Sequence, residues 1–440
     1  MKKLTGLLIL FVALLGVTEA YAHVDPDYKK RGSANGKRLL QARESCAPSQ
    51  AQYDQAINNV RARLSTGGDV WWDWTTGEGK YVVPNVDPRS GQPGVSSIFA
   101  GSVWLGGFDD FGNLKLAAQT YRNSTQVDFW PGPLDDETGK TSSDTCEKWD
   151  RFFHVNGNNI REFKKMYADA ERTGTPLRQE DVPRDIMEWP GNDNPYFFEY
   201  AGFQLPSTTQ GLAGFYDRNN DNIYDPLDGD FPVIEIRGCP IEAGDSPPDE
   251  MSFWIYNDAG NVHSMTGGQQ IQMEVQVQTF AFQSNDELND MTFQRYKLIN
   301  RARQSIDSTF FAMWVDPDLG CYTDDYIGCD TARELMYIYN FDAIDGETGC
   351  NCPQGVPTYC DNVPVLGVDY FRGPLNEFGQ EIGMSSFTYF NNPGISNPNP
   401  NTTDPDRNFP QQWYNYLSGS WKDGTRLSEG GTGYNPGSTD

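Results

Sequence analysis

The chain has 440 residues and a formal net charge of −27, from 34 basic and 61 acidic side chains. This excess of acid argues against nucleic acid as a partner, because binding a polyphosphate depends on clustered Lys and Arg. Metal cations are favoured partners instead. Aromatic residues make up 13% of the chain beside 44 Gly and 28 Pro, which is typical of short strands joined by tight turns.

The N-terminus has the pattern of a secretory signal peptide at residues 1–22. Lys2 and Lys3 precede an apolar run at residues 7–17, and Ala20-Tyr21-Ala22 forms a signal-peptidase site. No later run approaches the roughly 20 apolar residues that span a bilayer, so we expect no membrane insertion after cleavage. Residues 23–50 are polar with mixed charge and predict a flexible leader.

Alternating apolar residues between turn signals predict antiparallel hairpins along most of the chain. The first hairpin is expected over residues 97–122, around the turn at 109–113. Residues 158–172 are the one stretch with helical spacing, and an Asn is available there as the N-cap. Further strands are expected at residues 273–283, 291–300, 308–316 and 334–342, while residues 391–410 predict a long loop.

These elements predict an all-β, sandwich-like fold of short antiparallel strands and long loops, with one or two accessory helices. The chain is long enough for two or three domains of ordinary size. We expect two β-rich domains, the first carrying the helix and an acidic loop, followed by a loop-rich C-terminal segment; their bounds are residues 51–235, 236–390 and 391–440.

The acidic loop DRNNDNIYDPLDGDFP has the ligand spacing of a calcium-binding loop. Counted from Asp217 as position 1, oxygen-bearing side chains stand at positions 3, 5, 9 and 12, and the carbonyl oxygen of position 7 completes the pattern. Hard Ca²⁺ binds six to eight such oxygens. The predicted ligands are Asp217, Asn219, Asp221, Ile223 through its carbonyl, Asp225 and Asp228.

Two residues of this loop differ from the EF-hand pattern. Asn222 stands where Gly is usual, and Asp228 stands where a bidentate Glu is usual. Asn tolerates the left-handed conformation, so the turn is expected to survive. The loop leads into a strand and not a helix, which makes it similar to the loops of dockerins and extracellular calcium-stabilised repeats. The alternative is a solvated acidic turn at a strand entrance.

A second acidic group lies in WVDPDLGCYTDDYIGCD. It matches no standard calcium loop, and surface turn chemistry is the alternative. Eight cysteines in an exported chain indicate disulfides and an oxidising compartment, and a bond from Cys321 to Cys329 would make the group rigid. The candidate calcium ligands are Asp316, Asp318, Asp324, Asp325 and Asp330.

Enzyme signatures are mostly absent from the sequence. It contains no G-x-S-x-G, H-E-x-x-H, C-x-x-C or phosphate loop. A zinc site or a His-based triad would need His154 and His263. Two-carboxylate glycosidase chemistry stays open, because the distance between two carboxylates cannot be read from the sequence. The tryptophans of VWWDWTTG suit either sugar stacking or a sandwich core, and alternation favours the core; they are Trp71, Trp72 and Trp74.

An ordered set of motifs resembles the N-terminal region of large secreted surface proteins of Bacteroidota that leave the cell through the type IX secretion system. The resemblance covers residues 58–435. It implies export across both membranes and a β-rich protein with an adhesin-like or matrix role. The motifs include NNVRARLSTGGDVWWD, FWPGPLD, CEKWDRFF, EWPGNDNP, AGFYDRNNDNIYDPLDGDFP, DEMSFWIYNDAGNVH, MTFQRYKLINR, FFAMWVDPDLGCYTDDYIGCD and YNYLSGSWKDGT.

Members of that family usually continue into further β domains and a C-terminal sorting domain. This sequence ends at GGTGYNPGSTD without one, so we expect a fragment or a protein that takes another route, with the periplasm as the alternative location. The residues after Tyr414 are expected to supply a strand that lacks a neighbour, which would leave residues from 420 onward mobile and favour self-association.

The sequence therefore favours a secreted or cell-surface, calcium-stabilised β protein without catalytic function. Calcium would be structural, and surface glycans or matrix proteins are the candidate partners. A secreted carbohydrate-active enzyme or carbohydrate-binding module is the alternative.

Overall fold

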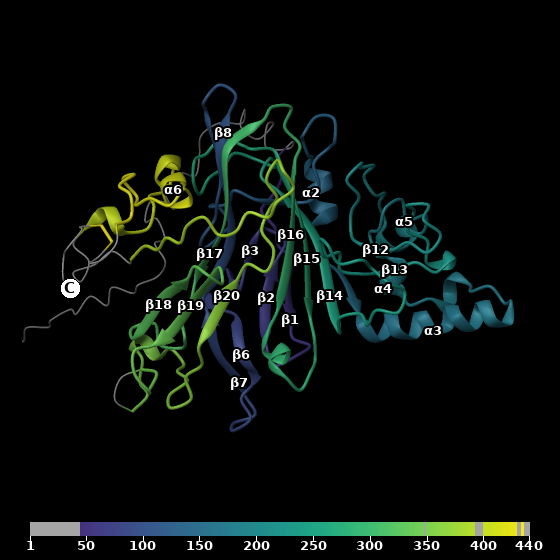
Figure 1. Cartoon of the computed structure of the whole chain (residues 1–440), viewed down its shortest axis with the longest axis horizontal. Helices are drawn as coiled ribbons and strands as arrows, with labels where there is room; N and C mark the ends of the chain where they lie inside the picture. Colours follow the sequence, from purple (N-terminus) through teal and green to yellow (C-terminus); the bar gives the residue numbers. More distant parts are fainter. Residues whose placement is uncertain (1–44, 347–348, 392–398, 429–432, 435–440) are drawn as a thin grey trace, which may run out of the picture. The chain divides into compact units, whose positions relative to one another are not determined.

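The computed structural model describes residues 45–346, 349–391, 399–428 and 433–434 (Figure 1). Two antiparallel sheets pack face to face, with helices on their outer faces. The all-β, sandwich-like fold is therefore confirmed. The expected signal peptide and residues 23–44 of the expected leader lie outside the described residues.

The first sheet has eight strands in the order β17-β8-β3-β2-β6-β7, with β1 beside β2 and β9 beside β8. The expected hairpin around residues 109–113 is its β8–β9 pair. Its strands are β1 (Gln52–Gln55), β2 (Arg61–Ser65), β3 (Asp69–Val70), β6 (Tyr81–Val86), β7 (Pro93–Ile98), β8 (Ala100–Asp109), β9 (Leu114–Ala117) and β17 (Ile306–Asp316).

The second sheet has five strands in the order β10-β14-β15-β16, with β11 also paired to β14. The other sheets are small: one of three strands, β18-β19-β20, and two of two strands. The second sheet comprises β10 (Trp130–Pro131), β11 (Phe153–Asn156), β14 (Glu250–Asn257), β15 (Met273–Ala281) and β16 (Phe293–Asn300). The small sheets comprise β4 (Trp72–Asp73), β5 (Glu78–Gly79), β12 (Phe215–Tyr216), β13 (Phe231–Pro232), β18 (Asp325–Asp330), β19 (Leu335–Asn340) and β20 (Leu366–Asp369).

Alternation along the strands produces layers, because successive side chains point to opposite faces of a sheet. On β8, Val103 and Leu105 enter the core between the two large sheets, while Trp104 enters a cluster on the outer face. On β14, Trp254 faces the same central core and Phe253 faces the helices. Trp71 also lies in the central core and Trp72 is buried, as the core interpretation of these tryptophans predicts.

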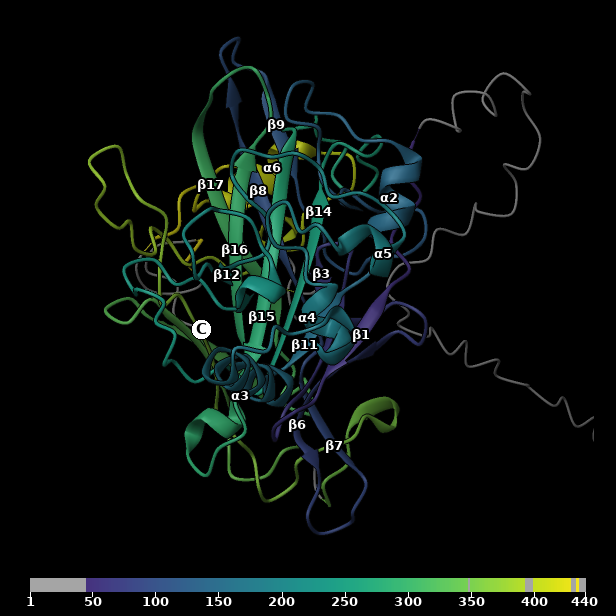
Figure 2. The same ribbon diagram turned by 90° about the vertical axis from the view of Figure 1, so that its right-hand side faces the viewer.

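Helices cover both outer faces of the sandwich. The predicted helix is α3, which Asn156 caps by accepting from the backbone N–H of Asn158, and Figure 2 shows it nearly end-on at the lower end of the second sheet. The helix α6 packs against β8 and β9 on the other side. The α-helices among the described residues are α2 (Ser143–Trp149), α3 (Gly157–Thr173), α4 (Arg184–Met187), α5 (Phe197–Ala201) and α6 (Pro410–Leu417), and the 3-10 helices are η2 (Gln179–Asp181), η3 (Pro226–Asp228), η4 (Glu287–Asp290), η5 (Pro353–Gly355) and η6 (Pro400–Thr402).

The segments expected to form separate domains share both large sheets. β17 pairs with β8, and β14 pairs with β10 and β11, so strands from either side of residue 235 are interleaved. The described residues accordingly form one compact unit. A domain boundary at residue 235 would therefore cut through both large sheets.

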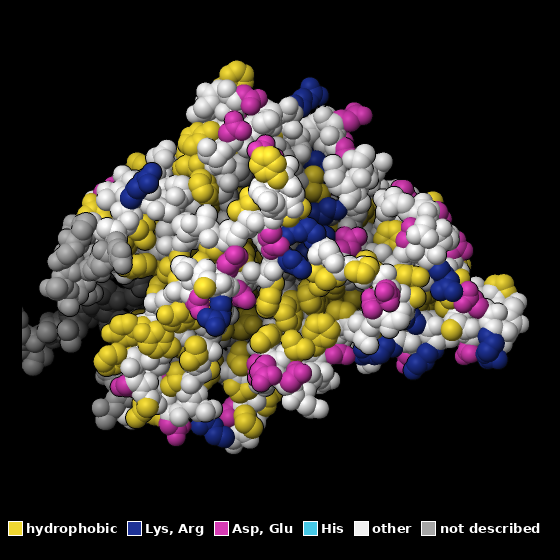
Figure 3. Space-filling view, in the orientation of Figure 1, with side chains coloured by type: hydrophobic (Ala, Val, Ile, Leu, Met, Phe, Trp, Pro, Cys, Tyr) yellow, Lys and Arg dark blue, Asp and Glu magenta, His cyan; other side chains and the backbone are white. Residues whose placement is uncertain are grey.

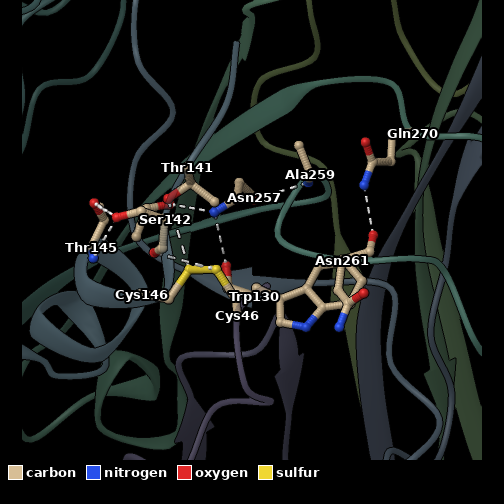
Figure 4. Close-up of a disulfide and its surroundings, with 11 residues drawn as sticks. Cys46, Trp130, Thr141, Ser142, Thr145, Cys146, Asn257, Ala259, Asn261 and Gln270 are labelled. Atoms are coloured by element: carbon tan, nitrogen blue, oxygen red, sulfur yellow. Dashed lines mark hydrogen bonds between the residues drawn. A yellow bond between two sulfur atoms is a disulfide. The ribbon is translucent and has the colours of Figure 1, made fainter. Parts of the chain in front are cut away.

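The last part of the expected leader, residues 45–50, is anchored and not flexible. Cys46 forms a disulfide with Cys146 (Figure 4), and its backbone N–H donates to the Gly260 carbonyl at 3.0 Å. Ser49 is fully buried, and its carbonyl accepts from the Arg122 guanidinium at 2.9 Å. Composition did not predict this anchoring, because polar residues occur both in flexible leaders and in segments that hydrogen-bond to buried groups.

The strand expected after Tyr414 is a helix, so that expectation is wrong. Pro410 begins α6, a position where its missing N–H costs nothing. Tyr414 and Leu417 are buried in the cluster around Trp104, and Trp421 beyond the helix is fully buried too. These apolar residues need no neighbouring strand because they pack onto the outer face of β8 and β9.

Candidate metal centres

The predicted calcium loop connects β12 to β13, whose antiparallel pairing brings its two ends together. It lies against α3, where Arg218 pairs with Glu171 at 2.8 Å and stands over the ring of Tyr167 at 4.8 Å. Residues 219–223 of the loop are exposed. The loop is thus fixed at its base and open to solvent at its tip.

The Asp217 carboxylate organises the tip by accepting backbone hydrogen bonds. The donors are the N–H groups of Asn220, at 2.7 Å, and of Asn222, at 2.8 Å, with Asp221 more distant at 3.3 Å. Asn222 has φ 63°, as expected for Asn at the position where Gly is usual. The carboxylate that would serve as the first calcium ligand is therefore already used by the backbone.

Three of the predicted ligands converge through one amide. The Asn219 side-chain N–H donates to Asp221 Oδ2 at 2.9 Å and to Asp228 Oδ2 at 3.4 Å. The Asp225 side chain instead caps η3 by accepting a hydrogen bond from the Leu227 N–H. Ile223 donates its N–H to Asp221 Oδ1 at 2.8 Å. The loop thus gathers Asp217, Asn219, Asp221 and Asp228 in the arrangement of an acidic turn.

Sequence reasoning missed Asp230, which lies beyond position 12 of the loop. It is fully buried and accepts from the N–H groups of Arg218, at 2.8 Å, and Asp225, at 2.9 Å. Burial raises the pKa of Asp230 to about 6, and the nearby carboxylates of Asp217 and Asp221 add to the effect. Asp230 ties the two ends of the loop together.

The second acidic group lies between the end of β17 and the start of β18. The Tyr121 hydroxyl donates to Asp316 Oδ2 at 2.6 Å, and the Leu319 N–H donates to Asp325 Oδ2 at 2.9 Å. Burial raises the pKa of Asp318, and the carboxylates of Asp316 and Asp325 raise it further. Burial also raises the pKa of Asp325 to about 7. The fold thus brings together acids that repel one another.

Asp345 completes this group and was not predicted, because it follows twenty residues later on another loop. It is fully buried and accepts from the N–H groups of Cys321, at 2.8 Å, and Tyr359. Asp324 Oδ2 accepts from the next residue in that loop, Gly346, at 3.0 Å. We call Asp316, Asp318, Asp324, Asp325 and Asp345 the acid cluster.

Three oxygen atoms at the acid cluster are enclosed without a hydrogen-bond partner among the described residues. They are Asp324 Oδ1, Asp325 Oδ1 and the side-chain oxygen of Asn340, which stands directly opposite Asp325 in the β18–β19 pair. A buried polar atom without a partner costs about 1–3 kcal/mol. Unpartnered oxygens beside crowded carboxylates are the chemistry that a hard cation satisfies.

The disulfides differ from the expected pairing, and the bond from Cys321 to Cys329 is wrong. Cys321 pairs with Cys352, and Cys350 pairs with Cys360, while Cys329 is free. β18 carries Cys329 away from the acid cluster, since a strand rises about 3.3 Å per residue. The Cys321 sulfur lies within 4.8 Å of ligand atoms of Asp324 and Asp345, but a disulfide sulfur is no thiolate ligand.

Asp330 lies at the far end of β18 and takes no part in the acid cluster. Its carboxylate pairs with Arg333, which lowers its pKa, and it accepts from the Ala332 N–H at 3.1 Å. Asp330 is thus an ordinary turn residue between β18 and β19, as its exposed neighbours indicate.

The two described histidines are both held by the fold. His263 is buried, with its ring nitrogens 2.7 Å from the Leu116 carbonyl and 2.6 Å from the Asp258 carbonyl. His154 lies between the Tyr53 hydroxyl and the Ser252 hydroxyl, at 3.3 and 3.1 Å. It borders a pocket of about 500 Å³ beside α4.

Comparison with protein families, with curated proteins and with solved structures finds no match to this chain. Within the residues that the structure describes, no helix combines the length and the apolar character needed to cross a membrane.

Proposed function

We propose that this protein is an exported β-sheet protein with a structural, adhesin-like or matrix role, stabilised by calcium at the acid cluster. Three disulfides among the described residues support an oxidising location outside the cytoplasm. The resemblance to type IX secretion substrates supports a cell-surface or released destination.

The observation that carries the calcium proposal is the set of unpartnered oxygens at Asp324, Asp325 and Asn340. The neighbouring acids Asp316 and Asp318 add negative charge, and burial raises the pKa of both carboxyls. Carboxylates in this state are stable only when they hold protons or a cation. At neutral pH in a calcium-rich exterior, Ca²⁺ bound at the acid cluster would supply a partner for unpaired carboxylate oxygens there.

The loop at residues 217–228 is the second proposed calcium site. Its side chains of Asn219, Asp221 and Asp228 converge, and its exposure gives an ion direct access. Because Asp217 already accepts three backbone hydrogen bonds, this site is expected to bind more weakly than the acid cluster.

Thermal unfolding tests the proposal. Binding to the native state alone stabilises it by about 2.7 kcal/mol when calcium is at 100 times its dissociation constant. The melting temperature should rise in millimolar CaCl₂ and fall in EGTA, with MgCl₂ as the control for ionic strength and charge. Equal melting curves in calcium and in EGTA would refute the calcium assignment.

A further inference from the structure

Three tyrosines lie together on one face of the small sheet, and we call Tyr326, Tyr337 and Tyr339 the tyrosine platform. Tyr326 stands directly opposite Tyr339 across β18 and β19, and Tyr337 stands opposite Gly328. Tyr326 is 50% exposed and Tyr339 is 42% exposed. Figure 3 shows a broad hydrophobic area on the face of the molecule where Figure 1 places these strands.

Gly328 allows the ring of Tyr337 to lie flat across β18. A Cβ at Gly328 would stand 2.4 Å from Tyr337 Cζ, 2.5 Å from its hydroxyl oxygen and 2.7 Å from Cε2. Nearly equal distances to three adjacent atoms place that position over the face of the ring and not at its edge. The ring therefore covers the glycine with one face and leaves the other face outward.

The neighbouring rings share this orientation. The Tyr339 ring is inclined 31° to that of Tyr337, with centroids 6.1 Å apart, and the Tyr326 ring is inclined 26° to that of Tyr339, with centroids 6.0 Å apart. The exposed Phe341 adjoins Tyr326 at 5.5 Å. The platform thus presents neighbouring aromatic rings both across and along the two strands.

We infer that the tyrosine platform binds a neutral polysaccharide chain. The C–H groups on the face of a sugar ring pack against the negative face of an aromatic ring, and tyrosine adds a hydroxyl at its rim. Neighbouring rings inclined by only 26° and 31° to one another suit a chain of repeating sugars that covers several of them. The net charge of −27 disfavours polyanions such as sulfated glycans.

A second copy of this chain fits the platform less well. It would bring the same net charge of −27 to the contact. Stable protein interfaces bury about 800 Å² per partner, which is more than three tyrosine rings supply, since a buried aromatic side chain contributes about 150–250 Å². A neutral chain that touches only the ring faces meets neither obstacle.

This inference goes beyond the calcium proposal and can fail separately from it. Asp325 begins β18, so calcium would steady the strand that carries Tyr326, while the rings of the platform pack against one another and against Phe341. Loss of glycan binding in EGTA alone would report on calcium. Loss on changing the tyrosines in saturating calcium reports on the platform.

The test is binding of the whole exported chain to immobilised neutral polysaccharides, namely β-glucan, xylan and mannan, with polygalacturonate and heparin as anionic arms. Tyr326→Ala and Tyr339→Ala should each weaken binding to a neutral glycan about tenfold, the effect of about 1.4 kcal/mol. Tyr339→Phe should retain most of the affinity because it keeps the ring. Phe378→Ala, an exposed aromatic elsewhere, is the matched control.

Gly328→Val tests the geometry, because it leaves every tyrosine in place but lifts the Tyr337 ring from the sheet. It should weaken binding as much as removing a ring does, with melting temperatures confirming that each variant folds. The inference is overturned if these variants bind like the parent, if only the anionic glycans bind, or if sedimentation shows a dimer that Tyr339→Ala dissociates.

Discussion

The loop at residues 217–230 and the acid cluster contain similar numbers of carboxylates but use them in opposite ways. In the loop, Asp217 and Asp230 together accept five backbone hydrogen bonds, so their oxygens already have partners. In the acid cluster, Asp324 and Asp325 each keep one enclosed oxygen without a partner. The loop has the residue spacing of a calcium-binding loop, whereas the acid cluster has enclosed carboxylate oxygens without a hydrogen-bond partner.

This difference shows that a regular spacing of Asp and Asn indicates a hydrogen-bonded turn more directly than it indicates a metal site. An Asp followed by Asn and Asp at alternate positions satisfies its own backbone, because short polar side chains reach N–H groups two or three residues on. The acid cluster is assembled from β17, β18 and a later loop held by the disulfide of Cys321 and Cys352. Its carboxylates face one another because tertiary structure forces them to.

The comparison is tested most strongly by removing one acid from each region. Asp325→Asn should abolish most of the calcium-dependent stabilisation, about 3 kcal/mol at saturating calcium, while Asp221→Ala in the loop should remove a smaller part. Chemical denaturation in calcium and in EGTA measures both. Asp330→Asn is the matched control, because Asp330 lies on the same strand but pairs with Arg333.

In EGTA, Asp325→Asn should be more stable than the parent, since it relieves repulsion among unpaired carboxylates. If Asp221→Ala instead eliminates the calcium effect and Asp325→Asn leaves it intact, the loop is the principal site and the comparison is reversed.

A buried acid outside both regions, Glu250, contributes its own pH dependence to the stability of the protein. Burial raises the pKa of Glu250 from 4.5 to about 7, although Tyr53 and Gln55 stand beside it. Since the folded state binds this proton more tightly, the contribution to stability is complete below pH 4.5 and is lost as pH rises through 7. The shift corresponds to about 3 kcal/mol.

Glu250→Gln should flatten this part of the pH profile, measured by urea denaturation between pH 4 and pH 8 in EGTA. The pH dependence that remains then belongs to the acids of the two regions. An unchanged profile in Glu250→Gln would show that this side chain is charged in the folded protein.

Sequence patterns predicted the strands well because apolar residues at every second position indicate extended chain, even though β8 and β15 proved to be buried on both faces. They predicted α3 from its apolar spacing and its Asn cap. They missed α6, whose aromatic residues suit a strand equally well, and the sharing of sheets across residue 235, which depends on pairing between distant segments. The sequence cannot show such pairing by itself.

For the candidate sites too, the sequence predicted what depends on neighbouring residues and missed what depends on distant ones. Local patterns located the loop of Asp217 and the acids around Asp324, because those residues are close in sequence. Asp345 and Asn340 join the acid cluster only through strand pairing and a distant loop, and the partner of Cys321 was equally hidden. Asp330 lies at the opposite end of β18 from Asp325, which sequence proximity could not reveal because it does not show the direction in which a strand runs.

Within the loop, Asp217 should matter more to stability than its neighbours even without calcium. Asp217→Ala removes the acceptor of three backbone N–H groups and should lower the free energy of unfolding by about 1–2 kcal/mol in EGTA. Asp221→Ala, measured in the same way, should cost less. Equal losses would show that the loop is not organised around Asp217.

The smallest expected effect concerns the backbone at Asn222, whose φ of 63° lies in the left-handed region. Asn222→Ala should cost about 1 kcal/mol, because a Cβ without a polar side chain is disfavoured there. Asn222→Gly should stay within about 0.5 kcal/mol, since Gly adopts this conformation without strain but gains freedom in the unfolded chain. Urea denaturation in EGTA measures both variants. If calcium binding holds the turn, adding calcium should recover part of the stability lost in Asn222→Ala. An identical loss with and without calcium would mean that the loop of Asp217 is an acidic turn that forms without calcium. The acid cluster would then be the sole proposed calcium site.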